Sequence, residues 1–423
     1  QVISRITEFY TSTETSPVHE IADSTRTGPA TTILAGVGVG LESSVAAILA
    51  IIVAIAVAVG LANGNTQFSL YLVSLIGIGL LSTTGIVVSQ DTFGPVSDNA
   101  AGIAEMSGEF EGEPQKIMVS LDAVGNTTKA ITKGVAIGSA VIAAVALFGA
   151  FVQTIVEQLG LKTTNSNYDK LTFINIAEPK TFIGLLIGGS IAFLASSFLI
   201  RAVGRSAGTV VEEVRKQFRE HPGIMDRTER PEYGRVVDIC TRASLRELAT
   251  PALIAVLAPV VVGFAIGYLA LGAFLAAAIL TAQLMANFLS NTGGAWDNSK
   301  KYIEDGHYGG KGSDSHKAAV IGDTVGDPFK DTAGPALNPL MKVMNLVSLL
   351  ILPAVISLQH NNAARYSISA AAFAVIAAGV VFSKRRVEGV TQPEPASLPT
   401  GPAAQGPVLD GGAAAEPARK VPS

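Results

Sequence analysis

The chain has 423 residues, of which 48% are hydrophobic and 15% are charged, and its mean hydropathy is +0.43. This balance is too apolar for a water-soluble fold of this length, so the sequence predicts a protein of the lipid bilayer. The net charge of −4 gives no reason to expect nucleic acid binding. The single cysteine excludes an internal disulfide framework, and the scattered histidines show no zinc-binding spacing, so any metal is expected to have oxygen ligands.

Apolar runs long enough to cross roughly 30 Å of hydrocarbon as helices recur along the chain. Their punctuation by Gly, Pro and charged residues predicts an all-α fold, a polytopic transmembrane helical bundle. About nine spans are expected, at residues 18–40, 43–63, 67–96, 121–155, 180–203, 248–270, 272–296, 318–357 and 366–383.

The two ends of the chain carry separate expectations. The chain opens on Gln1 with the tail of an apolar segment, which we interpret as the C-terminal part of a longer protein. A transmembrane domain is expected over residues 1–387. Residues 388–423 are rich in Pro, Ala and Gly and have almost no large apolar side chains, which predicts a disordered cytoplasmic tail.

Lys and Arg gather in residues 201–246, 300–317 and 384–386. The positive-inside rule places these segments in the cytoplasm, and the nine spans alternate consistently with that choice. The polar residues at the cytoplasmic helix ends are then Asp98, Asn126, Asp297 and the acidic run from Asp323 to Asp331.

The segment GDTVGDPFKDT, residues 322–332, carries the strongest chemical signal. Its Asp323, Asp327 and Asp331 recur every four residues and so share one face of a helix, with Lys330 beside them. Each charge at a bilayer centre costs at least roughly 2.5–3.5 kcal/mol, a cost that divalent cations would remove. An acidic helix end in solvent is the alternative, although the apolar run resumes at Ala333.

A second charged face lies in NTGGAWDNSKKYIE, residues 291–304, where Asp297, Lys300 and Lys301 stand at helical spacing. A carboxylate that holds Mg²⁺ beside lysines that neutralise phosphate oxygens suits a metal-bound phosphate. The alternative is a basic cluster that anchors the helix to lipid headgroups.

Two weaker segments complete the set: SDNAAGIAEMSGE, residues 97–109, supplies Asp98, and GNTTKAITKG, residues 125–134, supplies the amide oxygen of Asn126. Each alone is weak evidence, because Asn, Ser and Gly at a helix start are usually caps. The chain has no Walker A loop and no phosphorylation motif of P-type pumps, so nucleotide-driven transport is unsupported.

These segments, with GPALN at residues 334–338, resemble the membrane-integral pyrophosphatases, in the family's order, from ITEFYTS (6–12) to LNPLMKVMN (337–345). The resemblance implies a bundle of about 16–17 helices, of which this chain would carry about half or more. It implies a homodimer in the cell membrane whose site faces the cytoplasm. The implied activity is Mg²⁺-dependent hydrolysis of inorganic pyrophosphate coupled to ion translocation.

The resemblance also implies roles for single residues. Mg²⁺ and pyrophosphate would be held by Asp98, Asn126, Asp297, Asp323 and Asp327. The substrate's phosphates would be bound by Lys300, Lys301 and Lys330, with Asn338 just beneath the site. Asp331 would help orient and deprotonate the attacking water, and Lys342 would be the gate lysine. Lys129 and Thr132 match the potassium-independent subclass, whose members pump protons.

Two Asp-rich motifs of the family do not occur in this chain, so we expect the chain alone to be inactive. The rival hypothesis is a Mg²⁺ or secondary cation transporter without hydrolytic activity. Lysines beside the carboxylates argue against it, because they would repel a cationic cargo. A non-catalytic scaffold or regulatory fragment is the third hypothesis.

Overall fold

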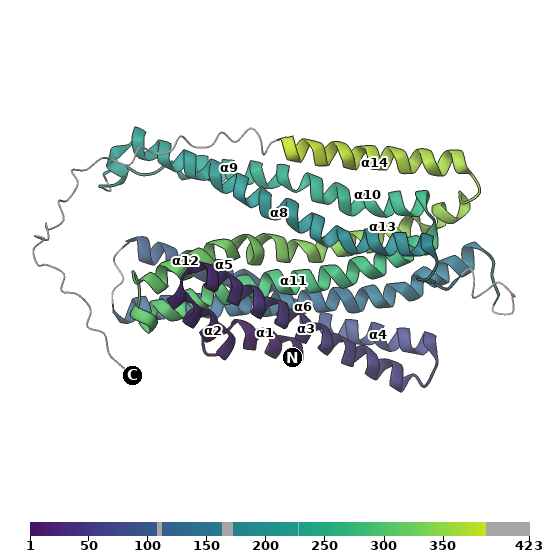
Figure 1. Ribbon diagram of the computed structural model, residues 1–423, viewed down its shortest axis with the longest axis horizontal. Coiled ribbons are helices and arrows are strands. Elements are labelled where there is room, and N and C mark those ends of the chain that lie inside the picture. Colours follow the sequence, from purple (N-terminus) through teal and green to yellow (C-terminus); the bar gives the residue numbers. More distant parts are fainter. Residues whose placement is uncertain (108–111, 163–171, 227, 386–423) are drawn as a thin grey trace, which may run out of the picture.

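The computed structural model describes residues 1–107, 112–162, 172–226 and 228–385 (Figure 1). Every regular element in these ranges is a helix, which confirms the all-α prediction. The expected disordered tail at 388–423 lies outside the described residues. The main helices are α1 (Val2–Thr11), α2 (Ser16–Ser24), α3 (Pro29–Leu61), α4 (Thr66–Leu81), α5 (Thr84–Ser107), α6 (Glu113–Gln158), α8 (Pro179–Glu220), α9 (Tyr233–Glu247), α10 (Ala249–Ala265), α11 (Tyr268–Glu304), α12 (Asp314–Asp327), α13 (Gly334–Ser357) and α14 (Asn362–Arg385).

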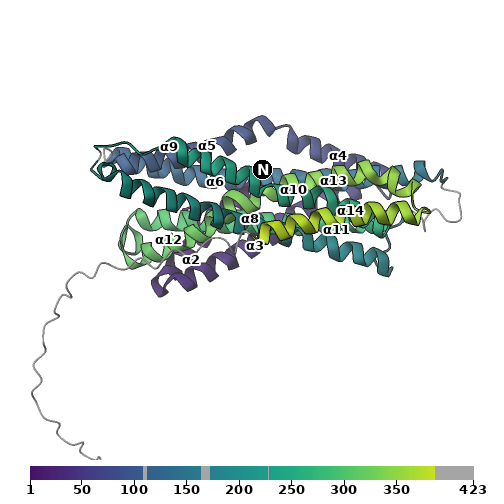
Figure 2. The same cartoon turned by 90° about the horizontal axis from the view of Figure 1, so that it is seen from above.

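Seven helical stretches of the described chain are long and apolar enough to cross a membrane, and α4 with α5 makes an eighth if the pair, bent by 47°, is one span. Figure 2 shows this bend between α4 and α5. The polytopic helical bundle is therefore confirmed. Large apolar side chains remain exposed along the outer helices, among them Leu49 and Val53 on α3 and Phe193 on α8, as lipid contact requires.

The N-terminal part differs from the expected spans. The sequence predicts two spans at 18–40 and 43–63, but α3 runs unbroken from Pro29 to Leu61. The predicted break rested on Glu42, whose charge interrupts the apolar run. In the structure Glu42 accepts a hydrogen bond of 3.1 Å from the hydroxyl of Tyr10, so the helix carries this carboxylate without ending.

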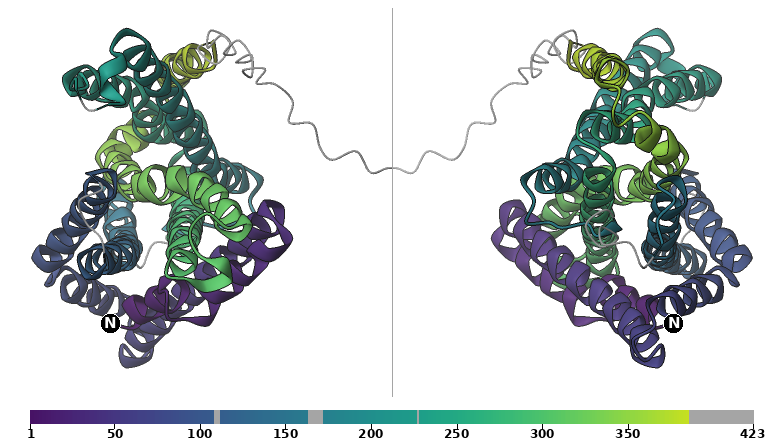
Figure 3. Two further views of the ribbon diagram at one scale, coloured as in Figure 1. Left: turned by 90° about the vertical axis from the view of Figure 1, so that its left-hand side faces the viewer. Right: turned by 90° about the vertical axis from the view of Figure 1, so that its right-hand side faces the viewer.

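Helix α11 is the centre of the bundle and packs against α3, α6, α8, α12 and α13. Figure 3 gives end-on views of the helices of the bundle. The helix begins after Gly267, whose φ of +135° lets the chain turn sharply from α10. Its first half is apolar and buried, while its last turns carry the charged segment that begins at Asp297.

Candidate active site

Asp297 lies at the centre of a charged cluster near the end of α11. Its carboxylate accepts a hydrogen bond from Lys330, while the Nζ atoms of Lys300 and Lys301 lie 3.5 Å and 3.4 Å from its Oδ1. The Asp297 side chain is only 5% exposed. A buried carboxylate is retained in its charged form only with such partners. The structure therefore brings together four residues that the sequence predicts for the site: Asp297, Lys300, Lys301 and Lys330.

Lys330 joins α11 to α12 electrostatically. Besides Asp297, its Nζ lies 2.9 Å from Asp327 Oδ1 and 3.3 Å from Asp323 Oδ1. Asp323 is shared in turn, because its Oδ2 accepts a hydrogen bond of 2.5 Å from Lys300. Carboxylates and ammonium groups thus alternate across the cluster, so each charge faces its opposite.

Asp331, the third aspartate of residues 322–332, does not lie where the sequence predicts. A π-helical turn, Pro328–Ala333, follows α12, whereas the predicted shared face of three aspartates assumes α-helical spacing throughout. Pro328 lacks an N–H group, and a wider turn is one way to continue past a proline. Asp331 consequently lies 3.6 Å from Nζ of Lys133 on α6, while Asp323 and Asp327 contact Lys330.

The charged helices meet through two glycines. A Cβ on Gly293 of α11 would lie 2.6 Å from both the carbonyl oxygen of Gly326 and Cβ of Lys330. Only glycine fits this crossing, and the close approach is what brings the Lys330 ammonium to Asp297.

A second group of predicted residues lies across the α5–α6 contact. The buried Lys129 donates a hydrogen bond of 3.1 Å to Asp98, and Thr132 donates one of 3.0 Å to Asp91. The Lys129 side chain runs over Gly94, where an added Cβ would lie 2.6 Å from Cε of the lysine. The ammonium is therefore held in place by packing as well as by charge.

Asn126 is buried on α6, and neither polar atom of its amide has a hydrogen-bond partner. One turn earlier, Oδ1 of Asp122 also has no hydrogen-bond partner, while its Oδ2 forms an ion pair of 2.5 Å with Lys301. Unpartnered carboxylate and amide oxygens are hard ligands of the kind that Mg²⁺ prefers. In the part of the chain that the structure describes, no three His, Cys, Asp or Glu side chains group closely enough to hold a metal by themselves.

Three residues that contact the site were not singled out in the sequence: Asp91, Asp122 and Lys133. Lys133 donates a hydrogen bond of 2.5 Å to the backbone oxygen of Lys330 and faces Asp331. A usable signal was present, because Asp122, Asn126, Lys129 and Lys133 follow one another at three- and four-residue steps and so share a helix face.

The remaining two predicted residues lie further along α13. Asn338 lines a cavity of about 200 Å³ together with Asp91, Thr132 and Lys133, and its Oδ1 has no partner. Lys342 is one helical turn beyond Asn338, and its side chain is exposed on the described chain. The structure thus connects Asn338 to the site by a cavity but gives Lys342 no contact with the charged cluster.

The fold and this cluster define a polytopic helical membrane protein that gathers alternating acidic and basic side chains at one end of its spans. The chain belongs to the inorganic H⁺ pyrophosphatase family, whose model matches residues 1–351.

Among similar proteins, the K(+)-insensitive pyrophosphate-energized proton pump of Streptomyces coelicolor is 54% identical over 408 residues, covering 94% of this chain and 51% of that protein. The protein of the same name from Streptomyces avermitilis is 55% identical and covers 91% of this chain and 49% of that protein. A putative K(+)-stimulated pyrophosphate-energized sodium pump of Clostridium tetani is 46% identical, covering 84% of this chain and 51% of that protein. The chain therefore spans about half the length of these relatives.

Proposed function

We propose that this chain is part of a membrane-integral inorganic pyrophosphatase that couples pyrophosphate hydrolysis to proton translocation. The observation that carries the proposal is the cluster around Asp297, where buried lysines and carboxylates alternate. A pyrophosphate anion competes for the lysines, and the carboxylates freed from them are then available to divalent cations. A cation transporter has no such use for ammonium groups among its ligands, so the cluster does not favour that alternative.

The cofactor of this proposal is Mg²⁺, held by Asp98, Asn126, Asp297, Asp323 and Asp327. The unpartnered amide oxygen of Asn126 and the carboxylates of the cluster fit such an ion. When bound, Mg²⁺ neutralises charge that develops on the phosphate oxygens. The remaining phosphate oxygens are bound by Lys300, Lys301 and Lys330. Asn338 lies beneath them and offers its amide as a hydrogen-bond donor or acceptor.

In the proposed reaction, a water oxygen attacks one phosphorus while the bridging P–O bond breaks, which yields two phosphates without a phosphoenzyme. Asp331 orients this water and accepts its proton. Lys133, 3.6 Å from the Asp331 carboxylate, fixes where that carboxylate points. The lysines stabilise the leaving phosphate. Lys342, further along α13, acts as the gate lysine of the ion path.

The potassium-independent subclass is proposed on Lys129 and Thr132. The Lys129 ammonium bonds to Asp98 from a buried position, which supports a role for it in place of a bound monovalent cation. We expect Lys129→Ala to make phosphate release in the full-length protein depend on added K⁺. The check is a K⁺ titration of hydrolysis, with the exposed Lys317→Ala as the control. A Lys129→Ala protein that is indifferent to K⁺ would show that the subclass is wrong.

The remaining elements of the proposal concern the whole protein. We propose that the full-length protein is a homodimer in the cell membrane. The cluster would face the cytoplasm, because the Lys- and Arg-rich segments flank that end of the spans. We propose residues 1–387 as the transmembrane domain, while the expected tail at 388–423 lies outside the described residues. Since the chain spans about half of its relatives, we expect this chain alone to be inactive.

The test of the hydrolytic function is phosphate release by the full-length protein in membranes, with pyrophosphate or ATP as substrate and with Mg²⁺ added or chelated. We expect release from pyrophosphate only, dependent on Mg²⁺ and lost in Asp331→Asn. Release that is absent in a well-folded protein would favour the cation transporter instead.

A further inference from the structure

The end of α1, which contains the segment ITEFYTS at residues 6–12, packs against both α6 and α11. Its Thr7 and Thr11 are at most 1% exposed. A Cβ on Gly134 of α6 would lie 2.8 Å from the hydroxyl oxygen of Thr7. A Cβ on Gly294 of α11 would lie 3.5 Å from Cγ2 of Thr11. The short helix therefore fits closely against the two helices that meet at the charged cluster, although the proposed reaction gives it no task.

The amide of Asn298 joins these three helices. Its Nδ2 donates a hydrogen bond of 2.5 Å to the backbone oxygen of Thr11 and another of 3.0 Å to the hydroxyl oxygen of Thr127 on α6. Because a carbonyl oxygen can only accept, the bond to Thr11 determines which way the amide is turned. Thr11 is the last residue of α1, where carbonyl groups lack partners in their own helix, so Asn298 also caps α1. Asn298 is 0% exposed, and both bonds are therefore shielded from solvent.

Two polar contacts set the register of α6 against α11 at the site. One is the hydrogen bond from Asn298 to Thr127, and the other is the ion pair of Lys301 with Asp122. Asn126 directly precedes Thr127, and neither polar atom of its amide has a partner. The place of Asn126 relative to α11 therefore depends on the turn of α6 that the bond from Asn298 holds.

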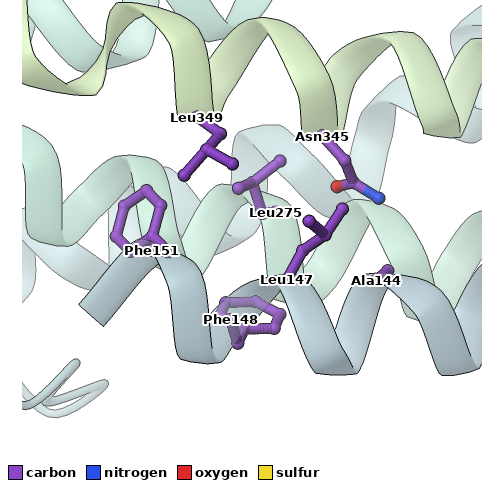
Figure 4. A pocket seen from close by; sticks show the side chains of 7 residues that line it. All are labelled: Ala144, Leu147, Phe148, Phe151, Leu275, Asn345 and Leu349. Atoms are coloured by element: carbon purple, nitrogen blue, oxygen red, sulfur yellow. The ribbon is translucent and has the colours of Figure 1, made fainter. Parts of the chain in front are cut away.

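Toward the other end of these two helices the contacts are apolar. Phe148 and Phe151 of α6 and Leu275 of α11 line a small cavity there, and side chains of α13 complete the lining (Figure 4). Apolar attraction is non-directional, so such contacts tolerate small shifts of one helix along the other. A hydrogen bond weakens steeply when its length or angle changes. The polar contacts at the site therefore fix the register more closely than the apolar contacts do.

We propose that Asn298 is a positioning residue of the proposed Mg²⁺ site. By bonding to Thr127, it holds the turn of α6 that carries Asn126 in register with the turn of α11 that carries Asp297. Consecutive residues of a helix point roughly 100° apart, so Asn298 faces α1 and α6 while Asp297 faces the lysines. The bond to Thr11 gives the segment at residues 6–12 its task, which is to support the amide. The inference rests on the proposed Mg²⁺-dependent function.

The first experiment measures the Mg²⁺ concentration that gives half-maximal phosphate release from pyrophosphate by the full-length protein in membranes. Thr127→Val keeps the shape of the side chain but removes the hydroxyl, whereas Thr127→Ser keeps the hydroxyl. We expect the valine variant to need roughly tenfold more Mg²⁺, the scale on which loss of an outer partner of a metal site acts, and to retain its rate at saturating Mg²⁺. The serine variant is expected to behave like the unmodified protein. The matched control is Thr154→Val, also on α6, whose hydroxyl donates to Ala150 of its own helix and whose Mg²⁺ requirement is expected to stay unchanged.

The second experiment needs no activity: it measures the Mg²⁺ concentration that gives half of the rise in unfolding temperature that bound Mg²⁺ produces. Thr127→Val and Asn298→Leu, which removes both hydrogen bonds, are expected to raise this concentration, and Thr127→Ser is not. An unchanged Mg²⁺ requirement in Thr127→Val overturns the inference. So does a lower maximal rate at an unchanged Mg²⁺ requirement, since that indicates a packing role only.

The two experiments separate this inference from the proposed function. An unmodified protein that is stabilised by Mg²⁺ but releases no phosphate contradicts the proposed hydrolysis, and the unfolding experiment then still decides the positioning role of Asn298. An unmodified protein whose unfolding temperature does not respond to Mg²⁺ overturns the positioning role, because there is then no bound ion whose ligands need to be placed.

Discussion

Asp297→Asn in the full-length protein is expected to reduce phosphate release from pyrophosphate by at least roughly 100-fold, the scale on which loss of one preorganised charge acts. The reason is position: Asp297 contacts the ammonium groups of Lys300, Lys301 and Lys330 and is almost completely buried. The asparagine keeps the shape but loses the charge that holds these lysines and, in the proposed site, a metal ion.

The matched control for this substitution is Glu304→Gln, on the same helix two turns further along. Glu304 pairs with His316, and no ion pair joins it to the three lysines in the described part of the chain. Its variant is expected to retain most of the hydrolysis. Equal activity of the two variants would mean that Asp297 is not at the centre of the site.

Lys330→Met is expected to lower the stability of the protein as well as its activity. The substitution removes a lysine that Asp297, Asp323 and Asp327 share, and breaking a buried ion pair from one side costs roughly 3–5 kcal/mol. Because Mg²⁺ would supply positive charge to the same carboxylates in the proposed site, we expect added Mg²⁺ to raise the unfolding temperature of this variant more than that of the unmodified protein.

Thermal unfolding with and without Mg²⁺ measures this difference. The control is Lys317→Met, since Lys317 is an exposed lysine of α12 whose partner, Asp314, is also exposed, and such surface pairs contribute little. A Lys330→Met protein whose stability is independent of Mg²⁺ would contradict the assignment of these carboxylates to a metal.

Much of the site could be predicted because its residues are close in sequence. Asp297, Lys300 and Lys301 share one helix face by spacing alone, and Asp323 and Asp327 do the same in the next segment. The approach of these two segments was not predictable from spacing. It depends on the crossing at Gly293, where the backbones of α11 and α12 meet without side chains between them. That contact places Lys330 against Asp297.

Two features lie elsewhere than the sequence predicts, and the structure gives a reason for each. Glu42 seemed to end a span, but Tyr10, far away in sequence, accommodates its carboxylate within α3. Asp331 was expected beside Asp327, but the π-helical turn after Pro328 moves it toward Lys133. Lys133 was missed because a lysine in an apolar run is ordinarily assigned to an interface, whereas here it donates to a backbone oxygen of the site.

We propose that the cluster around Asp297 hydrolyses pyrophosphate in the full-length protein and that this hydrolysis drives a proton across the membrane. The most direct test is to add pyrophosphate and Mg²⁺, without K⁺ or Na⁺, to inside-out vesicles that contain the full-length protein, and to record phosphate release and lumen pH together. The predicted result is release with acidification, both lost in Asp297→Asn. Release without acidification, or acidification that persists in Asp297→Asn, would contradict it.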